Sequence, residues 1–251
     1  MLAAHHLFKR YANLAVVDDV SLDVAGGALV GLIGTNGAGK STAFSIVTGF
    51  ETPDAGSVRF DGRDMTGLPP HARVRAGLGR TFQIPREFRH LTVSENLMAA
   101  APGQLGERLL NVYLRPSTVR AQEEAIRARA DELLAFLNLA AVAGHPSGTL
   151  SGGQKKLLEL GRILMVAPKM ILLDEPFAGV HPVLIEELAQ RIRDLNARGM
   201  AFLIVEHNLE ALSRLVSEIY VMDRGALIAH GTPDAVLDDA NVREAYMGGV
   251  A

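Results

Sequence analysis

The sequence contains no cysteine among its 251 residues. This absence excludes structural disulfides, zinc sites built on thiolates and a cysteine nucleophile. It is compatible with a protein that works in a reducing cytosol. Redox chemistry at cysteine is therefore not among the functions of this chain.

The chain also lacks an excess of either charge, since 25 lysines and arginines stand against 28 aspartates and glutamates. Its formal net charge of -3 does not provide the overall basicity that makes nucleic acid an obvious partner. Hydrophobic residues make up 48% and charged residues 21% of the sequence, which argues against disorder. An acidic ligand therefore needs a local positive site.

A long apolar run is the third absence. The longest stretch without Asp, Glu, Lys or Arg, residues 133–154, contains Asn138, Gly144, Pro146 and Ser151, which together indicate a helix end followed by a loop. The N-terminal segment lacks the apolar core of a secretory signal. The sequence therefore predicts no membrane span, and we expect a cytosolic chain.

Strand and helix patterns alternate along the chain and predict an α/β fold. Strand patterns open the sequence around a turn at 9–13, and Gly26-Gly27 is a second turn, of a kind typical of hairpins. The segment 126–137 carries apolar residues at helical spacing. The apolar runs 170–173 and 201–205 are typical of buried parallel strands in a βαβ unit.

These patterns divide the chain into a core and an insert. Residues 1–84 and 168–251 are predicted to form the core, which includes an antiparallel β-subdomain. Residues 85–167 are mostly helical and are predicted to form an inserted α-helical subdomain. The expected architecture is a single domain, 1–251, of α/β class.

A phosphate-binding motif follows the apolar strand pattern at 28–33 and precedes a helix pattern at 41–48. Its sequence GTNGAGKS fits the P-loop pattern G-x-x-x-x-G-K-[ST] in the required context. Glycines let backbone N–H groups converge on phosphate oxygens at a helix N-terminus. We expect Lys40 to hold the β- and γ-phosphates of a nucleoside triphosphate and Ser41 to bind Mg²⁺. The predicted contacts are Gly34, Thr35, Asn36, Gly37, Ala38, Gly39, Lys40, Ser41 and Thr42.

The strand pattern 170–173 ends in two carboxylates, Asp174 and Glu175. We predict that Asp174 holds Mg²⁺ and that Glu175 polarises an attacking water. A buried strand with a polar end is the alternative, since any α/β protein can contain one. The P-loop favours the functional interpretation, because open α/β sheets build ligand sites at strand ends.

A third motif, LSGGQ at 150–154, precedes a helix pattern at 155–166. The Ser151 side chain and the N–H groups of Gly152 and Gly153 can form a second anion site at the helix N-terminus, although a simple capping turn has the same composition. Together with the P-loop, this motif resembles the ATP-binding subunits of ABC transporters over essentially the whole chain. The resemblance implies a P-loop ATPase core with an inserted signature subdomain. It also implies that Ser151, Gly152, Gly153 and Gln154 close over ATP bound to a second ATPase subunit.

The resemblance implies roles for three further residues. Gln83 corresponds to the Q-loop glutamine, which senses Mg²⁺ and the attacking water. His207 corresponds to the switch histidine, which contacts the γ-phosphate. Tyr11 stands where the family places an aromatic side chain against adenine, although packing within the β-subdomain is an alternative for it.

Within the ABC transporters, the chain resembles the branched-chain amino acid importers, and the stretch 103–116 fits their longer ATPase subunit. The segments that carry this resemblance are GRTFQ at 79–83, LTVSENL at 91–97 and EPFAGVHP at 175–182. The resemblance implies an ATPase coupled to transmembrane transport, with ATP and Mg²⁺ as cofactors.

The implied partners are a second ATPase subunit, in a homodimer or heterodimer, and transmembrane permease subunits. A periplasmic substrate-binding protein is implied indirectly. The implied location is the cytoplasmic face of the inner membrane, where the permease holds the ATPase. The segment with Phe82, Ile84 and Phe88 is expected to contact the permease, with core packing as the alternative.

Two positions depart from the usual ABC pattern. Thr35 stands where most members have proline, and we expect its side chain to point away from the phosphates. His181 stands where most members have the D-loop aspartate, so the usual contact across the dimer does not carry over to it. Metal ligation by His181 is an alternative without an evident partner nearby in the sequence.

The rival function is a soluble ABC ATPase that acts on nucleic acid or ribosomes. Its support is the stretch 71–90, where five arginines stand against one glutamate: Arg73, Arg75, Arg80, Arg86, Arg89 and Glu87. A solvated face, or salt bridges to partner loops, explains this density of charge better. We therefore expect no nucleic acid partner.

Overall fold

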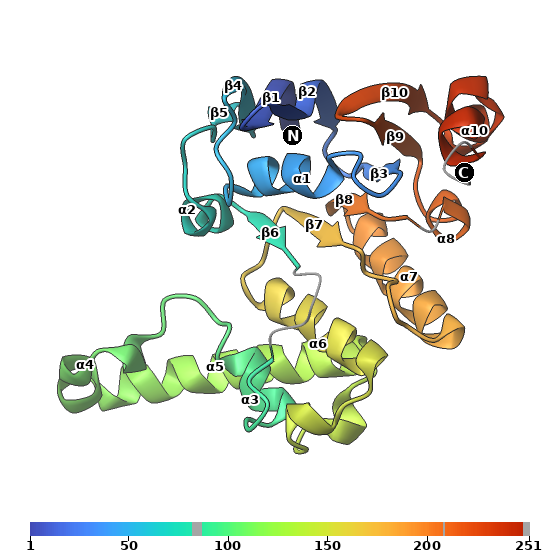
Figure 1. Cartoon of the computed structure of the whole chain (residues 1–251). Helices are drawn as coiled ribbons and strands as arrows, with labels where there is room; N and C mark the ends of the chain where they lie inside the picture. Colours follow the sequence, from blue (N-terminus) through green and yellow to red (C-terminus); the bar gives the residue numbers. More distant parts are fainter. Residues whose placement is uncertain (82–86, 208, 248–251) are drawn as a thin grey trace. The chain divides into compact units, whose positions relative to one another are not determined.

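The computed structural model describes residues 1–81, 87–207 and 209–247 (Figure 1). The chain forms two compact units. Unit 1 comprises Met1–Gln83, Lys169–Ala178 and Ile192–Ala251, and unit 2 comprises Ile84–Pro168 and Gly179–Arg191. The segment 179–191, which the sequence assigned to the core, thus clusters with the helical unit. Its Asn138–Glu187 hydrogen bond of 3.1 Å is one contact within that unit.

The first sheet of unit 1 is antiparallel and confirms the predicted β-subdomain. Its strand order is β2-β1-β4-β5. The bounds are β1 Leu2–Tyr11, β2 Leu14–Val24, β4 Ala55–Phe60 and β5 Arg63–Asp64. The turn predicted at 9–13 is wrong in its extent, because Lys9 and Arg10 continue the ladder by pairing with Val17 and Ala15.

The second sheet of unit 1 has six strands in the order β10-β9-β3-β8-β7-β6. The bounds are β3 Leu29–Gly34, β6 Leu78–Arg80, β7 Met170–Asp174, β8 Ala201–Val205, β9 Glu218–Asp223 and β10 Ala226–Gly231. All neighbours pair in parallel except the β9–β10 hairpin. Every residue of β3, β7 and β8 is buried, which explains their continuous apolar runs.

The hairpin predicted at Gly26-Gly27 is wrong. This turn joins β2 of the antiparallel sheet to β3, which pairs with β8 and β9 in the other sheet. The physical reason is the composition of β3, since a fully apolar strand is stable only with both faces covered. Helix α1, Lys40–Thr48, lies against strands of both sheets.

The remaining helices of unit 1 lie at its periphery. They are α2 Pro70–Arg75, α8 Leu209–Ser213, α9 Pro233–Asp238 and α10 Ala240–Met247. Helix α7, Pro182–Ala197, contributes residues to both units. The Thr232 side chain caps α9 by accepting a hydrogen bond from the Ala235 N–H.

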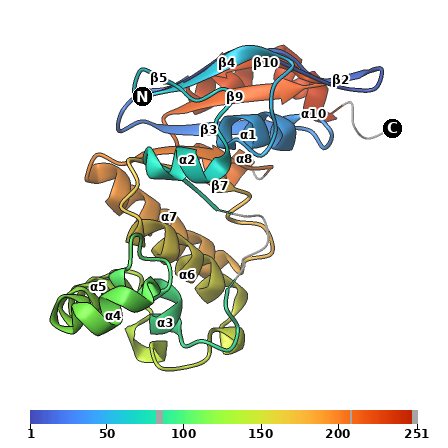
Figure 2. The same ribbon diagram turned by 90° about the vertical axis from the view of Figure 1, so that its left-hand side faces the viewer.

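Unit 2 is helical and is built on α3 Val93–Met98, α5 Pro116–Phe136 and α6 Gly152–Met165. Gly161 of α6 permits their close approach, because an added Cβ would lie 2.7 Å from Leu137 and 2.8 Å from Leu97. The short helix α4, Leu109–Leu114, runs beside α5 (Figure 2). Three single turns complete the unit: η1 Leu105–Glu107, η2 Ala140–Val142 and η3 Ser147–Thr149. Within the described residues, every helix is too short or too polar to cross a membrane.

Candidate functional site

The P-loop connects the buried strand β3 to helix α1. Gly37 and Gly39 have φ angles of 80° and 96°, which residues other than glycine rarely adopt. A Cβ at Gly39 would also lie only 2.2 Å from the carbonyl oxygen of Val16. Helix α1 has no side-chain cap at its N-terminus. The backbone N–H groups at the start of α1 are therefore available to an anionic ligand.

Lys40 lies within its own loop. Its ammonium donates hydrogen bonds to the carbonyl oxygens of Gly34 at 2.8 Å and Thr35 at 2.9 Å. Burial lowers the pKa of Lys40, and the carboxylate of Glu175 opposes that shift. The loop from Asn36 to Thr42 lines a cavity of about 200 Å³ together with Val16 and Glu175. The structure thus brings this part of the predicted P-loop site to one face with Glu175.

A larger cavity of about 800 Å³ borders the beginning of the loop. It is lined by Thr35 to Ala38, by the β9–β10 turn and by α10. The Thr35 hydroxyl donates a hydrogen bond to Asp223 at 3.0 Å. The side chain of Thr35 is thus directed to the end of β9, in keeping with the expectation that it does not serve the phosphates.

Asp174 and Glu175 stand at the end of β7, as the sequence predicts. Asp174 is buried, and its backbone N–H donates to the Thr81 hydroxyl at 3.0 Å. Glu175 has a φ of 46°, a backbone angle that residues other than glycine adopt only at a cost in free energy. Its N–H donates to the carbonyl oxygen of Val205 at 2.9 Å, at the end of β8. The strained backbone at Glu175 is thus fixed by the neighbouring strand.

His207 lies near the carboxylate of Glu175. The distance between His207 Nδ1 and Glu175 Oε1 is 4.0 Å, and the distance to Glu206 Oε2 is 3.7 Å. Glu206 is fully buried and accepts hydrogen bonds from the N–H groups of Phe177 at 2.8 Å and His207 at 3.1 Å. Glu206 therefore ties the segments after β7 and β8 together and places His207 beside Glu175.

The oxygen donors at this site are compatible with Mg²⁺. Among the described residues, no three His, Cys, Asp or Glu side chains lie close enough to hold a metal ion alone. Mg²⁺ in nucleotide sites usually takes one or two protein ligands, with phosphate oxygens and water completing its shell. The Ser41 hydroxyl in the first turn of α1 and the Asp174 carboxylate are donors of this type.

The basic stretch before the Q-loop position is largely committed to contacts within unit 1. Arg73 is 1% exposed and donates hydrogen bonds to the carbonyl oxygens of Ile46 at 2.8 Å and Val47 at 2.6 Å. These carbonyls belong to the last turn of α1, where a cation is favourable. Burial lowers the pKa of Arg73 to about 10. The expectation of a solvated face is therefore wrong for Arg73.

Arg80 is the second arginine that the sequence analysis interpreted incorrectly. Its guanidinium lies 4.7 Å from the ring centre of Phe44 and 4.5 Å from that of Phe50. It donates to the Thr48 hydroxyl at 2.7 Å and lies 3.5 Å from the Asp174 carboxylate. Arg80 thus links the end of α1 to Asp174. No signal in the sequence separates it from the exposed Arg75.

The LSGGQ motif at 150–154, which we call the signature turn, forms the self-capped N-terminus of α6 in unit 2. The Ser151 hydroxyl accepts a hydrogen bond from the Gln154 N–H at 3.3 Å, and the Gln154 amide oxygen accepts one from the Ser151 N–H at 3.0 Å. Ser151 and Gly152 are exposed. Gly153 is buried, and a Cβ there would lie 2.4 Å from the side chain of Leu184.

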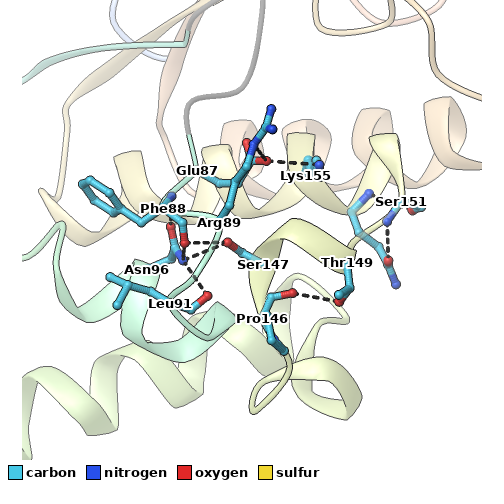
Figure 3. A network of polar contacts seen from close by, with 11 residues as sticks. Glu87, Phe88, Arg89, Leu91, Asn96, Pro146, Ser147, Thr149, Ser151 and Lys155 are labelled. Carbon is cyan, nitrogen blue, oxygen red and sulfur yellow. Dashed lines mark hydrogen bonds and ion pairs between the residues drawn. The ribbon is translucent and has the colours of Figure 1, made fainter.

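A buried amide that no sequence motif indicated joins the segment 87–91 to Ser147, shortly before the signature turn (Figure 3). Asn96 in α3 is fully buried, accepts from the Phe88 N–H at 2.9 Å and donates to the Ser147 hydroxyl at 3.1 Å. Nearby, Lys155 of α6 pairs with Glu87 at 3.1 Å. The segment 87–91 is thus joined to Ser147, which precedes the signature turn, and to Lys155, which directly follows it. Asn96 and Ser147 lie 51 positions apart in the sequence, and Glu87 and Lys155 lie 68 apart (155 minus 87), so no local pattern reveals these contacts.

The other residues with a predicted role stand as follows. Gln83 lies outside the described residues, as do Phe82 and Ile84. Tyr11 is 46% exposed at the end of β1, with the Lys9 ammonium 5.6 Å from its ring centre. His181 is exposed, and its Nδ1 accepts a hydrogen bond from the Val183 N–H at 3.4 Å.

Comparison with known proteins adds two family matches. The family model described as ABC transporter matches residues 17–178. A second model, described as branched-chain amino acid ATP-binding cassette transporter, matches residues 226–251.

Individual relatives match over nearly the whole chain. The lipopolysaccharide export system ATP-binding protein LptB of Acidithiobacillus ferridurans is 40% identical, over 99% of this chain and 97% of its own length. The probable branched-chain amino acid transport ATP-binding protein LivG of Archaeoglobus fulgidus is 39% identical, over 99% and 95%. The crystal structure of the ADP conformation of MJ1267, an ATP-binding cassette of an ABC transporter, aligns with a TM-score of 0.85 at 37% identity, over 99% of this chain and 98% of that one.

Proposed function

Because the chain belongs to the ABC transporter family, as one of its ATP-hydrolysing subunits, we propose that it drives an importer of branched-chain amino acids or related polar small molecules. The resemblance to ABC ATP-binding subunits is confirmed. The main support for this class of transported molecule is the match of residues 226–251 to the branched-chain amino acid ATP-binding cassette transporter family. Relatives named LivG, at 39% and 38% identity, support the same class.

A second candidate cargo is lipopolysaccharide. The LptB protein of Acidithiobacillus ferridurans, at 40% identity, is as similar to this chain as the LivG proteins are. That protein belongs to an export system, so the two candidates differ in the direction of transport as well as in cargo.

The two cargoes can be separated in a reconstituted transporter. The chain is purified with the permease subunits encoded beside it and placed in proteoliposomes, and ATP hydrolysis is measured. Stimulation by a leucine-loaded binding protein supports the importer. Stimulation by lipopolysaccharide alone contradicts it.

For nucleotide binding, we propose that the P-loop amides and Lys40 hold the triphosphate. The ammonium of Lys40 exchanges its bonds to Gly34 and Thr35 for bonds to phosphate oxygens, because a charge-assisted contact with an anion is the stronger one. Ser41 and Asp174 would hold Mg²⁺, which neutralises phosphate charge when bound. Tyr11 is proposed to stack on adenine, which its 46% exposure permits.

For hydrolysis, we propose that Glu175 accepts a proton from the attacking water as the water oxygen bonds to the γ-phosphorus and the bond to the β-phosphate oxygen breaks. His207, 4.0 Å from this carboxylate, positions the γ-phosphate. Lys40 stabilises the charge of the transferring phosphoryl group. Gln83 is proposed to sense the water and Mg²⁺.

ABC ATPases work as dimers with transmembrane permease partners. We propose that Ser151 to Gln154 close over ATP held by the P-loop of a second ATPase subunit, either a copy of this chain or a related one. The exposure of Ser151 and Gly152 supports such a contact. The permease would hold the pair at the cytoplasmic face of the inner membrane and receive cargo from a periplasmic binding protein.

The variant Glu175→Gln tests this mechanism. Loss of the proton acceptor should reduce ATP hydrolysis at least about 100-fold, while ATP-dependent dimers persist in size-exclusion chromatography. Glu123→Gln in α5 alters an exposed carboxylate and serves as the control. Unchanged hydrolysis by Glu175→Gln would remove Glu175 from the mechanism.

A further inference from the structure

Helix α4 presents an apolar surface to solvent. The side chains of Leu109, Leu110, Tyr113 and Leu114 are between 73% and 80% exposed, and Val112 is 41% exposed. We call these five side chains the α4 patch. They are five of the thirteen large apolar residues exposed among the described residues, although α4 has only six positions. Single exposed apolar residues are ordinary, whereas a cluster on one short helix indicates a binding surface.

The polarity of α4 is the reverse of that of an ordinary surface helix. Asn111, its polar residue, faces the unit and donates a hydrogen bond to the Leu105 carbonyl at 3.1 Å. The apolar side chains face solvent instead. Helix α4 lies beside α5, at the end of α5 that is remote from α3 (Figure 1). A helix that keeps its polar residue inside and its apolar residues outside is built to meet an apolar medium.

Exposed arginines lie at both ends of the α4 patch. Residues 108–122 contain Arg108, Arg115 and Arg120 and no aspartate or glutamate. All three arginines are exposed, and their guanidinium groups form no ion pair with any residue that the structure describes. Arg108 and Arg115 flank α4 directly. The excess of positive charge is confined to residues 108–122, because Glu107 precedes this stretch and Glu123 and Glu124 follow it.

We propose that the α4 patch rests on the anionic lipid surface of the membrane. Leucines enter the boundary of the acyl chains, Tyr113 lies at the level of the headgroups, and the flanking arginines bind lipid phosphates. The charge selects lipid over a second copy of this chain, because two copies would bring the arginines of both patches together. This surface is independent of the nucleotide site and of the cargo.

Vesicle flotation with the full-length protein tests this proposal. The protein should float with vesicles of phosphatidylcholine and phosphatidylglycerol, and less with phosphatidylcholine alone. Added salt should weaken the binding. Leu109→Ser with Leu110→Ser should reduce the partition coefficient more than about tenfold. Arg108→Gln with Arg115→Gln should reduce it about fivefold for each arginine.

A matched control is Leu14→Ser, which removes a leucine that is 67% exposed in unit 1 and should leave flotation unchanged. A second readout uses the absence of cysteine, because Tyr113→Cys accepts a single environment-sensitive fluorophore. Its emission should shift to the blue on anionic vesicles, and a label at Leu14→Cys should not shift.

Several results would overturn the proposal. One is flotation that is the same with and without phosphatidylglycerol, or that the leucine variant leaves intact. Another is a change from dimer to monomer in the leucine variant without vesicles, which would assign the patch to a second copy. Crosslinking from Tyr113→Cys to a permease chain in the purified transporter would assign it to a protein partner.

Discussion

The P-loop and the signature turn are both glycine-rich starts of helices, but they are held in opposite ways. The P-loop relies on the left-handed backbone of Gly37 and Gly39 and has no side-chain cap. The signature turn has ordinary backbone angles and a reciprocal cap between Ser151 and Gln154. One turn is shaped by backbone conformation, and the other by side-chain hydrogen bonds.

This difference bears on what each turn can bind. The P-loop keeps its cation, Lys40, inside the loop and leaves the N–H groups of α1 open to a ligand. In the signature turn, the Gln154 N–H is already bonded to Ser151, so the N–H groups of Gly152 and Gly153 remain for an anion. This difference supports the proposal that the P-loop binds phosphate with its own groups, whereas the signature turn completes a site shared with a second subunit.

The largest expected effect is that of Lys40→Ala. The variant removes the ammonium that we propose binds the phosphates, so ATP hydrolysis should fall about 100-fold or more. Lys169→Ala removes a surface ammonium paired with Asp61 at 2.7 Å and serves as the control. Hydrolysis and ATP affinity are both measured. If Lys40→Ala bound and hydrolysed ATP as the unmodified protein does, the proposed role of Lys40 in phosphate binding would be wrong.

A pair of glycine variants tests backbone control against side-chain control. Gly39→Ala forces a side chain onto a left-handed backbone and against the Val16 carbonyl, and should lower the free energy of unfolding by about 3 kcal/mol. Gly153→Ala meets only the side chain of Leu184, so its cost should be smaller. Leu184→Ala should relieve the clash at Gly153.

Urea unfolding measures both costs. The comparison fails if Gly153→Ala costs as much as Gly39→Ala, or if Leu184→Ala brings no relief.

Asn96→Asp tests the buried support of the signature turn. The change places a carboxylate next to the carbonyl oxygens of Phe88 and Thr92, to which the amide now donates at 3.1 Å and 3.0 Å. The expected loss of stability is about 3 kcal/mol. Asn241→Asp alters an exposed amide and should cost little. Equal urea midpoints for the two variants would mean that the network of Asn96 does not stabilise unit 2.

The smallest expected effect is that of Ser151→Ala. Loss of the cap should lower the free energy of unfolding by about 1 kcal/mol, whereas Ser117→Ala at an exposed position in α5 should have no measurable effect. A Ser151→Thr variant should retain most of the stability, because its hydroxyl can cap α6. A full loss in Ser151→Thr would show that the role of Ser151 is not capping.

The sequence revealed the parts of the site that are contiguous in the chain. The P-loop, the carboxylates after β7 and the signature turn each need residues at fixed spacing, so each leaves a local pattern. Arg73, Arg80 and Asn96 were missed or misinterpreted because their partners come from other elements. For example, Arg80 contacts Thr48 and Asp174, which are 32 and 94 positions away.

The sequence by itself determined the α/β class, the phosphate motif and the helical insert, because glycine conformation, apolar periodicity and capping act over a few neighbouring residues. Tertiary structure decided that Gly26-Gly27 joins two sheets, that Arg73 and Arg80 serve α1, and that the apolar side chains of α4 face outward. The physical reason is that burial and pairing depend on which distant residues meet. An arginine or a leucine has the same local signature in either environment.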